Sequence, residues 1–159
     1  MSSKNDSESS SSTPEQQMMF NDTRHIGIVV RDIEKTAEYY SQKLGISFTI
    51  RTMEHSGSLY GEPMKYKAKI AHAKVGSATF ELLQHVEGKC LIEEFLKKQG
   101  EGIHHIAVDA PVPLDAEIEK WQKRGIKALQ IDRMSPGEGT AYMDVPGCMI
   151  ELLCFNRKK

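Results

Sequence analysis

The sequence lacks the features that mark several large classes of protein. Its 21 basic and 22 acidic residues give a formal net charge of −1, so there is no excess of positive charge of the kind that binds nucleic acid or an anionic membrane. No run approaches the roughly 18 apolar residues of a membrane-spanning helix, and the N-terminus has no apolar segment like that of a secretory signal. We therefore expect a cytoplasmic protein with neither a nucleic-acid nor a membrane partner.

Cysteine is also scarce. The chain has three, Cys90, Cys148 and Cys154, which show neither the pairing of a disulfide framework nor a CxxC metal-binding motif. Disulfide frameworks belong to oxidising compartments, so this count favours a reducing one. We expect the three thiols to be ordinary core or surface groups.

The first twenty residues differ in composition from the rest of the chain. They hold seven serines and almost no apolar periodicity before Met18, so they cannot bury enough surface to offset the entropy lost on ordering. A transit peptide would be rich in Arg and poor in acids, whereas this stretch has three acidic residues and no Arg. We predict a disordered Ser-rich tail over residues 1–20 and a single domain over residues 21–156.

The domain contains an internal repeat, with one half over residues 21–85 and the other over residues 102–156. Each half opens with a histidine that begins a short apolar run, His25–Val30 in the first and His105–Val108 in the second. Such runs, bounded by polar turn residues, are typical of buried strands. The repeat indicates two copies of one structural unit.

The remainder of each half follows the same plan. An amphipathic helix is predicted next, ending at a glycine twenty residues after the histidine, Gly45 or Gly125. Each half closes with an apolar strand interrupted by one carboxylate, Glu81 or Glu151, and two more strands fit before it. The predicted unit is therefore βαβββ, twice, which makes an α+β fold. The apolar helix positions are Ile33, Ala37, Tyr40 and Leu44, then Leu114, Ile118 and Trp121, and the intervening strands are 47–53, 66–75, 128–132 and 140–144.

A short segment, residues 90–98, joins the halves. Its apolar residues fall on one side and Gly100 follows it, which predicts a packed connecting helix. Helices that cover one face of each sheet leave the other face free to form a cup. We expect a functional site in that cup.

Two histidines and two glutamates occupy equivalent places in the two halves: His25, His105, Glu81 and Glu151. They would converge in the cup if the halves pack about a pseudo-twofold axis. A lone histidine is more often a hydrogen-bonded core residue and a lone strand glutamate is usually exposed. A carboxylate within an apolar run, however, needs a cation to offset its desolvation. We predict a divalent metal site, for which imidazole and carboxylate ligands suit Co, Zn, Mn, Ni or Fe.

The other histidines are weaker candidates. His104 and His105 are adjacent, so in a regular strand they point to opposite faces and only one can enter the cup. Alignment with His25 selects His105 and leaves His104 to line the approach or to support the site by a hydrogen bond. We assign no role to the histidines without a counterpart in the repeat, His55, His72 and His85.

Together these motifs resemble the vicinal-oxygen-chelate superfamily, which includes glyoxalase I, methylmalonyl-CoA epimerase, extradiol dioxygenases and some antibiotic-resistance proteins. The resemblance covers residues 21–155 and rests on HIGIVVRDIEKTAEYYSQKLG, FELLQ, GEGIHHIAVDA and VPGCMIELL, in this order. It implies a glyoxalase-like cupped sheet with helices on its outer face. It also implies that one divalent metal ion is bound by His25, Glu81, His105 and Glu151.

Within the superfamily the chain most resembles methylmalonyl-CoA epimerase, because ELL is followed by the short helix IEEFLKKQG and then by a GxGIHHIA strand. This implies a metal-dependent isomerase that removes the α-proton of a chelated acyl-CoA, or of another thioester or thiol adduct, with Glu151 as one acid–base group. The epimerases usually carry a second glutamate on the strand before FELL. Here that stretch, residues 65–70, has lysines that suit a solvated edge strand, and Glu54 and Glu62 lie nearby.

Other members of the superfamily offer alternatives. A glyoxalase I-type lyase, acting on a glutathione hemithioacetal, would use the same kinds of ligand. An extradiol dioxygenase needs two histidines and one carboxylate on iron, so Glu81 counts against it. A non-catalytic small-molecule-binding protein often lacks the metal residues, so the complete set counts against that as well. The resemblance is compatible with a homodimer.

Overall fold

The computed structural model of the chain describes residues 18–20 and 22–156. Most of the predicted tail thus lies outside the described residues, and its disorder stays a prediction. The end of that stretch is packed, however, because the ring of Phe20 stacks on Trp121 with centroids 6.1 Å apart and Met19 joins the same apolar cluster. The domain therefore begins to pack before Asn21, where we had placed its start.

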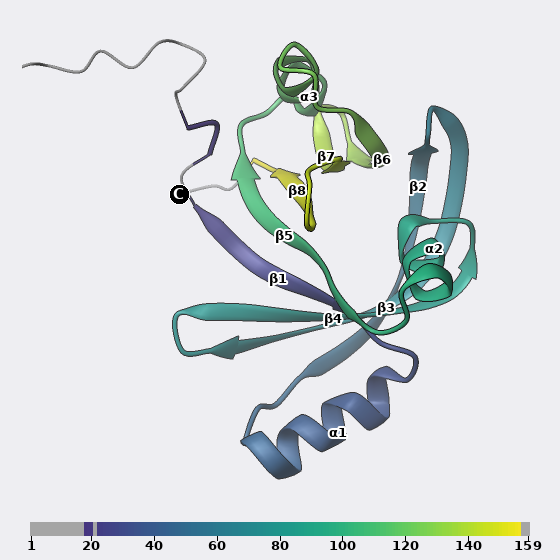
Figure 1. Cartoon of the computed structure of the whole chain (residues 1–159), viewed down its shortest axis with the longest axis vertical. Helices are drawn as coiled ribbons and strands as arrows, with labels where there is room; N and C mark the ends of the chain where they lie inside the picture. The colour runs from purple at the N-terminus through teal and green to yellow at the C-terminus, as the bar shows by residue number, and fades with distance from the viewer. Residues whose placement is uncertain (1–17, 21, 157–159) are drawn as a thin grey trace, which may run out of the picture.

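The described residues form eight strands and three helices (Figure 1). Each half has the same order, strand, helix and three strands, and the remaining helix, α2, connects the halves, which confirms the prediction of βαβββ twice in an α+β fold. The elements are β1 (Thr23–Val29), α1 (Ile33–Leu44), β2 (Thr49–Leu59), β3 (Glu62–Val75), β4 (Ala78–Gly88), α2 (Leu91–Lys98), β5 (Gly102–Ala110), α3 (Leu114–Gln122), β6 (Ala128–Ser135), β7 (Glu138–Met143) and β8 (Met149–Cys154).

The predicted cup is a sheet that closes on itself, in the order β1-β4-β3-β2-β6-β7-β8-β5. The two halves meet at two seams, where β1 pairs with β5 and where β2 pairs with β6, both antiparallel. The two seams lie on opposite sides of the closed order. Because β3 pairs with both β2 and β4, the prediction that residues 65–70 form an edge strand is wrong.

The helices lie outside the barrel and cover apolar patches of its strands. Ile33 and Ala37 of α1 pack on Ala71 and Leu82, and the apolar face of α3 packs on β7 and β8. Leu44, which we placed on the apolar face of α1, is instead 60% exposed. Among the described residues, no helix has the length and apolar character needed to cross a membrane.

Of the two helices predicted to end at a glycine, only α1 does so. Gly45 caps α1 in the left-handed conformation at φ 69°, as a C-terminal glycine does. In the second half α3 ends at Gln122, and Gly125 forms the turn beyond it at φ 80°. The prediction of a helix running to Gly125 is therefore wrong by about one turn.

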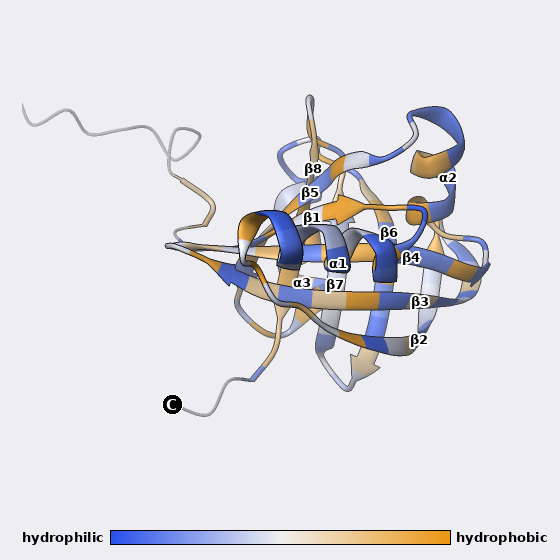
Figure 2. Ribbon diagram, turned by 90° about the horizontal axis from the view of Figure 1, so that it is seen from below, coloured by the Kyte–Doolittle hydropathy of each residue, from blue (hydrophilic) through white to orange (hydrophobic). Residues whose placement is uncertain are grey.

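The hairpin of β2 and β3 is longer than its apolar pattern suggested. Strand β2 continues to Leu59, six residues past the predicted end, and its last residues pair with β6 to close the second seam. Gly57 is needed there, because a Cβ would lie 1.8 Å from the carbonyl oxygen of Ile131. Figure 2 shows hydrophilic and hydrophobic residues alternating along β3, as expected for a strand with two different faces.

Candidate metal centre

The pairing of β1 with β5 places the two histidines. His25 lies opposite Ala107, and Gly27 lies opposite His105, so the pairing is reciprocal. Two antiparallel strands with this register are related by a local twofold axis that runs between them. Each half therefore delivers its histidine to the same place.

The parallel neighbours of these strands place the two glutamates. Glu81 on β4 lies beside Gly27, and Glu151 on β8 lies beside Ala107. In each half, then, the glutamate neighbours the residue that is two positions after the histidine. The repeat found in the sequence is thus a repeat of geometry as well.

Both first strands carry an irregularity directly before the histidine. Arg24 on β1 and His104 on β5 are extra residues in the β1–β5 register, and such bulges re-aim neighbouring side chains. We expected His104 and His105 to point to opposite faces of a regular strand. Both side chains are buried, at 1% and 0% exposure, and the ring of His104 also packs against Phe95 of α2, with centroids 5.1 Å apart.

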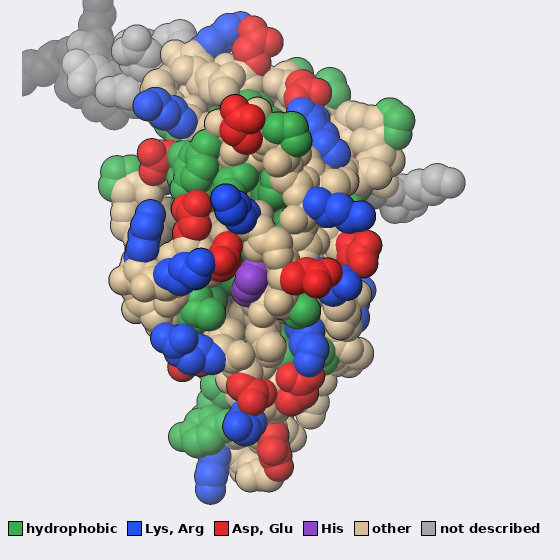
Figure 3. Space-filling model, turned by 90° about the vertical axis from the view of Figure 1, so that its right-hand side faces the viewer, with side chains coloured by type: hydrophobic (Ala, Val, Ile, Leu, Met, Phe, Trp, Pro, Cys, Tyr) green, Lys and Arg blue, Asp and Glu red, His purple; other side chains and the backbone are tan. Residues whose placement is uncertain are grey.

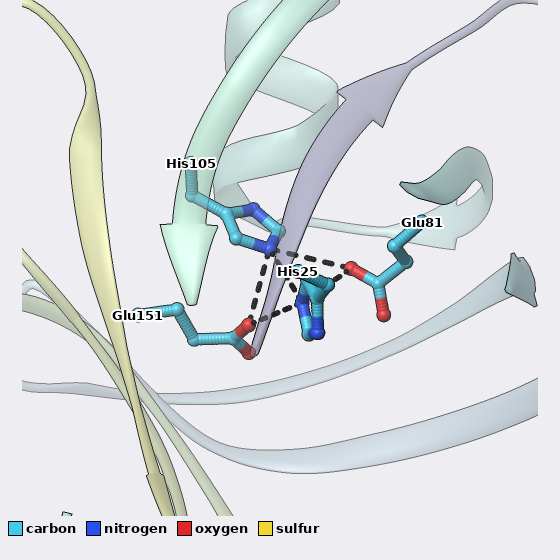
Figure 4. Close-up of side chains that lie close together, drawn as sticks. All are labelled: His25, Glu81, His105 and Glu151. Carbon is cyan, nitrogen blue, oxygen red and sulfur yellow. Dashed lines mark hydrogen bonds and ion pairs between the residues drawn. The ribbon is translucent and has the colours of Figure 1, made fainter. Parts of the chain in front are cut away.

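The four predicted side chains converge at one point (Figure 4). Nε2 of His25 lies 3.2 Å from Oε2 of Glu81 and 3.2 Å from Oε2 of Glu151. Nε2 of His105 lies 3.3 Å and 3.1 Å from the same two atoms, and 3.1 Å from Nε2 of His25. One ligand atom from each residue thus lies within 4.8 Å of all the others, and all four residues are buried.

The electrostatics of this cluster follow from burial and charge. Burial lowers the pKa of His25, but the hydrogen bonds that it donates to Glu151 and Glu81 and the negative charges of these residues outweigh it and raise the pKa to about 10. His105 is raised to about 9 in the same way. Burial raises the pKa of Glu151, yet the charge of His105 and its hydrogen bond lower it to about 2. The pKa of Glu81 is likewise held well below its usual range.

The donor set fits a divalent cation. Two imidazoles and two carboxylates are ligands that Zn and related transition metals accept. Without a cation, the two carboxylates are balanced by protons on the two imidazoles. A divalent ion brings the same two positive charges and would replace those protons, so the four residues could hold a metal ion without leaving the buried site charged.

Two further histidines support these side chains. Nδ1 of His105 lies 2.9 Å from Nδ1 of His104, and such a bond to the second ring nitrogen orients a ligating imidazole. His72 lies opposite Glu81 in the β3–β4 register, with Nε2 2.9 Å from Oε1 of Glu81. We assigned His72 no role, because it has no counterpart in the repeat. Its partner on the adjacent strand could not be known from the sequence.

A cavity of about 510 Å³ opens beside the cluster and is lined by His25, Glu81 and Glu151. Arg51 and Lys74 also line it. Buried carboxylates at one end and cationic side chains on the wall give the cavity both signs of charge.

The wall across from the cluster holds polar residues that the sequence did not reveal. The carboxyl group of Asp132, 2% exposed, accepts a hydrogen bond from Tyr66 at 2.8 Å and from Gln130 at 3.0 Å. His55, which we also assigned no role, is buried and stacks on Tyr66 with ring centroids 4.7 Å apart. The alternation Gln130-Ile131-Asp132 gives one weak signal, since both polar residues share a face of the strand.

The acidic residues near the lysine-rich segment lie outside the cavity. Glu54 is an exposed partner of Lys67, and Glu62 lies exposed at the start of β3. Lys69 pairs with Glu34 of α1, so these lysines serve the outer surface. Figure 3 shows the face seen from the right of Figure 1, where Lys and Arg are interleaved with Asp and Glu rather than gathered into a patch of one sign.

Comparison with known proteins identifies the family. The model of the glyoxalase/bleomycin resistance protein/dioxygenase superfamily matches residues 24–143. The chain belongs to this superfamily. It is also 32% identical over 128 residues to the uncharacterized protein YqjC of Bacillus subtilis (strain 168), covering 72% of this chain and 82% of that protein. The resemblance inferred from the sequence motifs is thereby confirmed.

Solved structures of superfamily members share the fold. Methylmalonyl-CoA epimerase from Mycobacterium tuberculosis is similar at a TM-score of 0.62 and 21% identity, covering 90% of this chain and 95% of that chain. A Streptomyces coelicolor methylmalonyl-CoA epimerase variant in complex with 2-nitronate-propionyl-CoA is similar at 0.61 and 23% identity, covering 86% and 96%. At these identities the likeness supports the fold of this superfamily member.

Proposed function

We propose that this chain is a metal-dependent enzyme of the methylmalonyl-CoA epimerase type. It would bind one divalent cation through His25, Glu81, His105 and Glu151, and it would invert a carbon next to a thioester carbonyl. The observation that carries the proposal is the convergence of four ligand atoms within 4.8 Å of one another beside a cavity. The likeness to epimerase structures, one of them with an acyl-CoA analogue, supports this choice.

The chemistry needs charge stabilisation and a base. A bound divalent cation would stabilise the negative charge that grows on the carbonyl oxygen as the α-proton leaves. Glu151 lines the cavity. As a ligand of the cation it would be ionised, and it would act as the group that accepts the proton.

The substrate would be an anionic acyl thioester. A carboxylate next to the reacting carbon would give the substrate a second oxygen beside the thioester carbonyl, and Arg51 and Lys74 on the cavity wall favour negative charge. A volume of about 510 Å³ suits the acyl end of such a molecule. The remainder of the thiol carrier would then extend toward solvent.

The test combines metal content with isotope exchange. We expect the purified protein to contain close to one divalent metal per chain by mass spectrometry. In deuterium oxide it should exchange the α-proton of methylmalonyl-CoA, followed by NMR, and a chelator should stop the exchange until metal is restored. Metal without exchange would contradict the epimerase activity and direct the search to glyoxalase-type hemithioacetals. Absence of metal would favour a ligand-binding protein.

A matched pair of variants separates the site from general damage. His25→Ala removes a cavity-lining ligand, and it should abolish both metal binding and exchange. His85→Ala removes a histidine whose Nε2 bonds to the carbonyl of Gly88, and it should leave both unchanged. Equal loss in both variants would count against the assigned ligands.

A further inference from the structure

The barrel wall that faces the metal centre carries a second polar cluster. The four ligands lie on the adjacent strands β8, β5, β1 and β4, whereas Asp132, Tyr66 and His55 lie on β6, β3 and β2, in the other half of the closed order. All three line the same cavity as the ligands. An eight-stranded barrel is just wide enough to hold one small ligand between its walls. A molecule bound at the metal centre would therefore have Asp132 on its other side.

Asp132 is held in a fixed position. Its Oδ2 accepts a hydrogen bond from the Tyr66 hydroxyl at 2.8 Å, and its Oδ1 accepts one from Nε2 of Gln130 at 3.0 Å. Gln130 is itself anchored, since its Oε1 accepts from the backbone N–H of Leu91 at 2.8 Å. Such a network holds the carboxyl group in one orientation, as a reacting group requires.

The core does not account for this cluster. Among the described residues, the only basic group within ion-pair range of Asp132 is Nδ1 of His55, at 3.7 Å. Neither ring nitrogen of His55 has a hydrogen-bond partner there. Buried polar groups are normally satisfied, because leaving them bare costs about 1–3 kcal/mol each. Unmet polar groups that face a cavity indicate a ligand.

We propose that Asp132 is the second proton-transfer residue of this cavity, acting on the face of the substrate that is turned away from Glu151, with Tyr66 and Gln130 as positioning residues. The assignment rests on the proposed function, because inversion needs one group to remove the α-proton and another to replace it from the opposite side. It also explains how the chain can lack a cavity-facing glutamate on β3.

The step balances without a further reactant. Glu151 takes the α-proton, the C–H electron pair forms the carbon–carbon double bond of an enolate, and the carbonyl electrons move to oxygen. Asp132 then gives its proton to the opposite face of the same carbon, and the electrons return to the carbonyl. Glu151 ends protonated and Asp132 ionised, and each exchanges its proton with solvent before the next turnover in the same direction.

The environment of Asp132 suits a proton donor. Burial raises its pKa to about 6, although the hydrogen bonds from Tyr66 and Gln130 act in the other direction. A carboxyl group with this pKa is partly protonated near neutral pH and transfers a proton readily in either direction. The two carboxyl groups of the cavity thus have different environments, as an acid and a base require.

The test follows each epimer of methylmalonyl-CoA separately in deuterium oxide, with Asp132→Asn against wild type. We expect the variant to interconvert the epimers at least 100-fold more slowly, the usual scale for losing an acid–base group. One epimer should still exchange its α-proton within about threefold of wild type, because Glu151 is intact. Metal content by mass spectrometry should match wild type.

Two further variants guard the interpretation. Asp115→Asn alters an exposed carboxylate paired with Arg133, and it should change nothing. Tyr66→Phe keeps the ring and removes one hydrogen bond to Asp132. It should slow interconversion by about tenfold, and it should slow α-proton exchange much less.

The outcomes separate the two proposals. Wild-type interconversion in Asp132→Asn, or an equal fall of exchange and interconversion, would overturn the role of Asp132 and leave the epimerase proposal standing. If wild type itself exchanges neither epimer, the proposed function fails, and the assignment of Asp132 fails with it.

Discussion

The two seams that join the halves of the barrel are built differently. At the β1–β5 seam, each half contributes one histidine at the equivalent place in the register, and the four metal-ligand candidates gather around it. At the β2–β6 seam, the first half contributes His55 and the second contributes Gln130 and Asp132. The two halves thus carry matching polar residues at the seam where the cation would bind, and different polar residues at the seam that would face the substrate.

The largest expected effect lies at the symmetrical seam. His105→Ala leaves Glu81 and Glu151 buried with one imidazole fewer, and removing one partner of a buried charge pair costs about 3–5 kcal/mol. We expect the metal-free variant to lose about that much free energy of unfolding in urea and to bind no stoichiometric metal. His25→Ala should lose less stability, because His25 borders the cavity. Normal metal content in His105→Ala would refute the centre.

At the other seam, the expected effect depends on pH. The pKa of Asp132 is about 6 in the folded chain against an ordinary 3.8. The buried carboxyl group is therefore harder to ionise in the folded chain than in the unfolded chain, and the free energy of unfolding falls as the pH rises from about 4 through 6. Asp132→Asn removes that loss. Its free energy of unfolding, relative to wild type, should therefore rise by roughly 3 kcal/mol between pH 4 and pH 7, since two pKa units correspond to that energy. Glu54→Gln, which changes an exposed residue of β2, should show no such trend. A difference in unfolding free energy between Asp132→Asn and wild type that does not change with pH would contradict the assigned environment.

Each seam also contains a glycine at which a larger residue would make a close contact. A Cβ on Gly57 would meet the backbone oxygen of Ile131 at 1.8 Å, whereas a Cβ on Gly27 would meet the His105 ring at 2.1 Å. Both alanine variants should lose about 1–3 kcal/mol through overpacking. Only Gly27→Ala should also weaken metal binding, by about 10- to 100-fold. Competition titrations with a chelating dye would measure the metal affinity of both variants. Equal affinities in Gly27→Ala and Gly57→Ala would contradict the expected difference between the seams.

The smallest expected effect concerns the two bulges before the histidines. His104→Phe leaves Nδ1 of His105 without its partner, so metal affinity should fall about tenfold, the lower end for losing such support. Arg24→Gln alters the equivalent residue of the first half, which pairs with Asp109 on the surface. It should change metal affinity less than twofold. Similar losses of metal affinity in both variants would contradict a specific role of the His104 side chain.

The symmetrical seam could be predicted from the sequence, and the other could not. The histidines and glutamates recur at matching places in two apolar repeats, so one half predicts the other. The register that brings them together involves β1, β4, β5 and β8, whose apolar runs are unmistakable. What periodicity could not show is the bulge at His104, because an extra residue leaves the composition of a strand unchanged.

The β2–β6 seam escaped prediction for a physical reason. The end of β2, from Glu54 to Ser58, has no apolar alternation, since one side faces a polar cavity and the other is exposed. Its pairing with β6 joins segments about 75 residues apart in sequence, a separation similar to that of the β1–β5 seam, but no matched pair of polar residues marks it. Asp132 and His55 were therefore overlooked, although they share a cavity with the predicted ligands.

The division of the ligands between the halves has a mechanical consequence. Each half owns one histidine and one glutamate of the cluster, so a cation held by all four would be a cross-link between two pieces of chain. Binding that favours the assembled barrel over its opened forms stabilises it by mass action. Metal would then slow the parting of β1 from β5 more than the parting of β2 from β6.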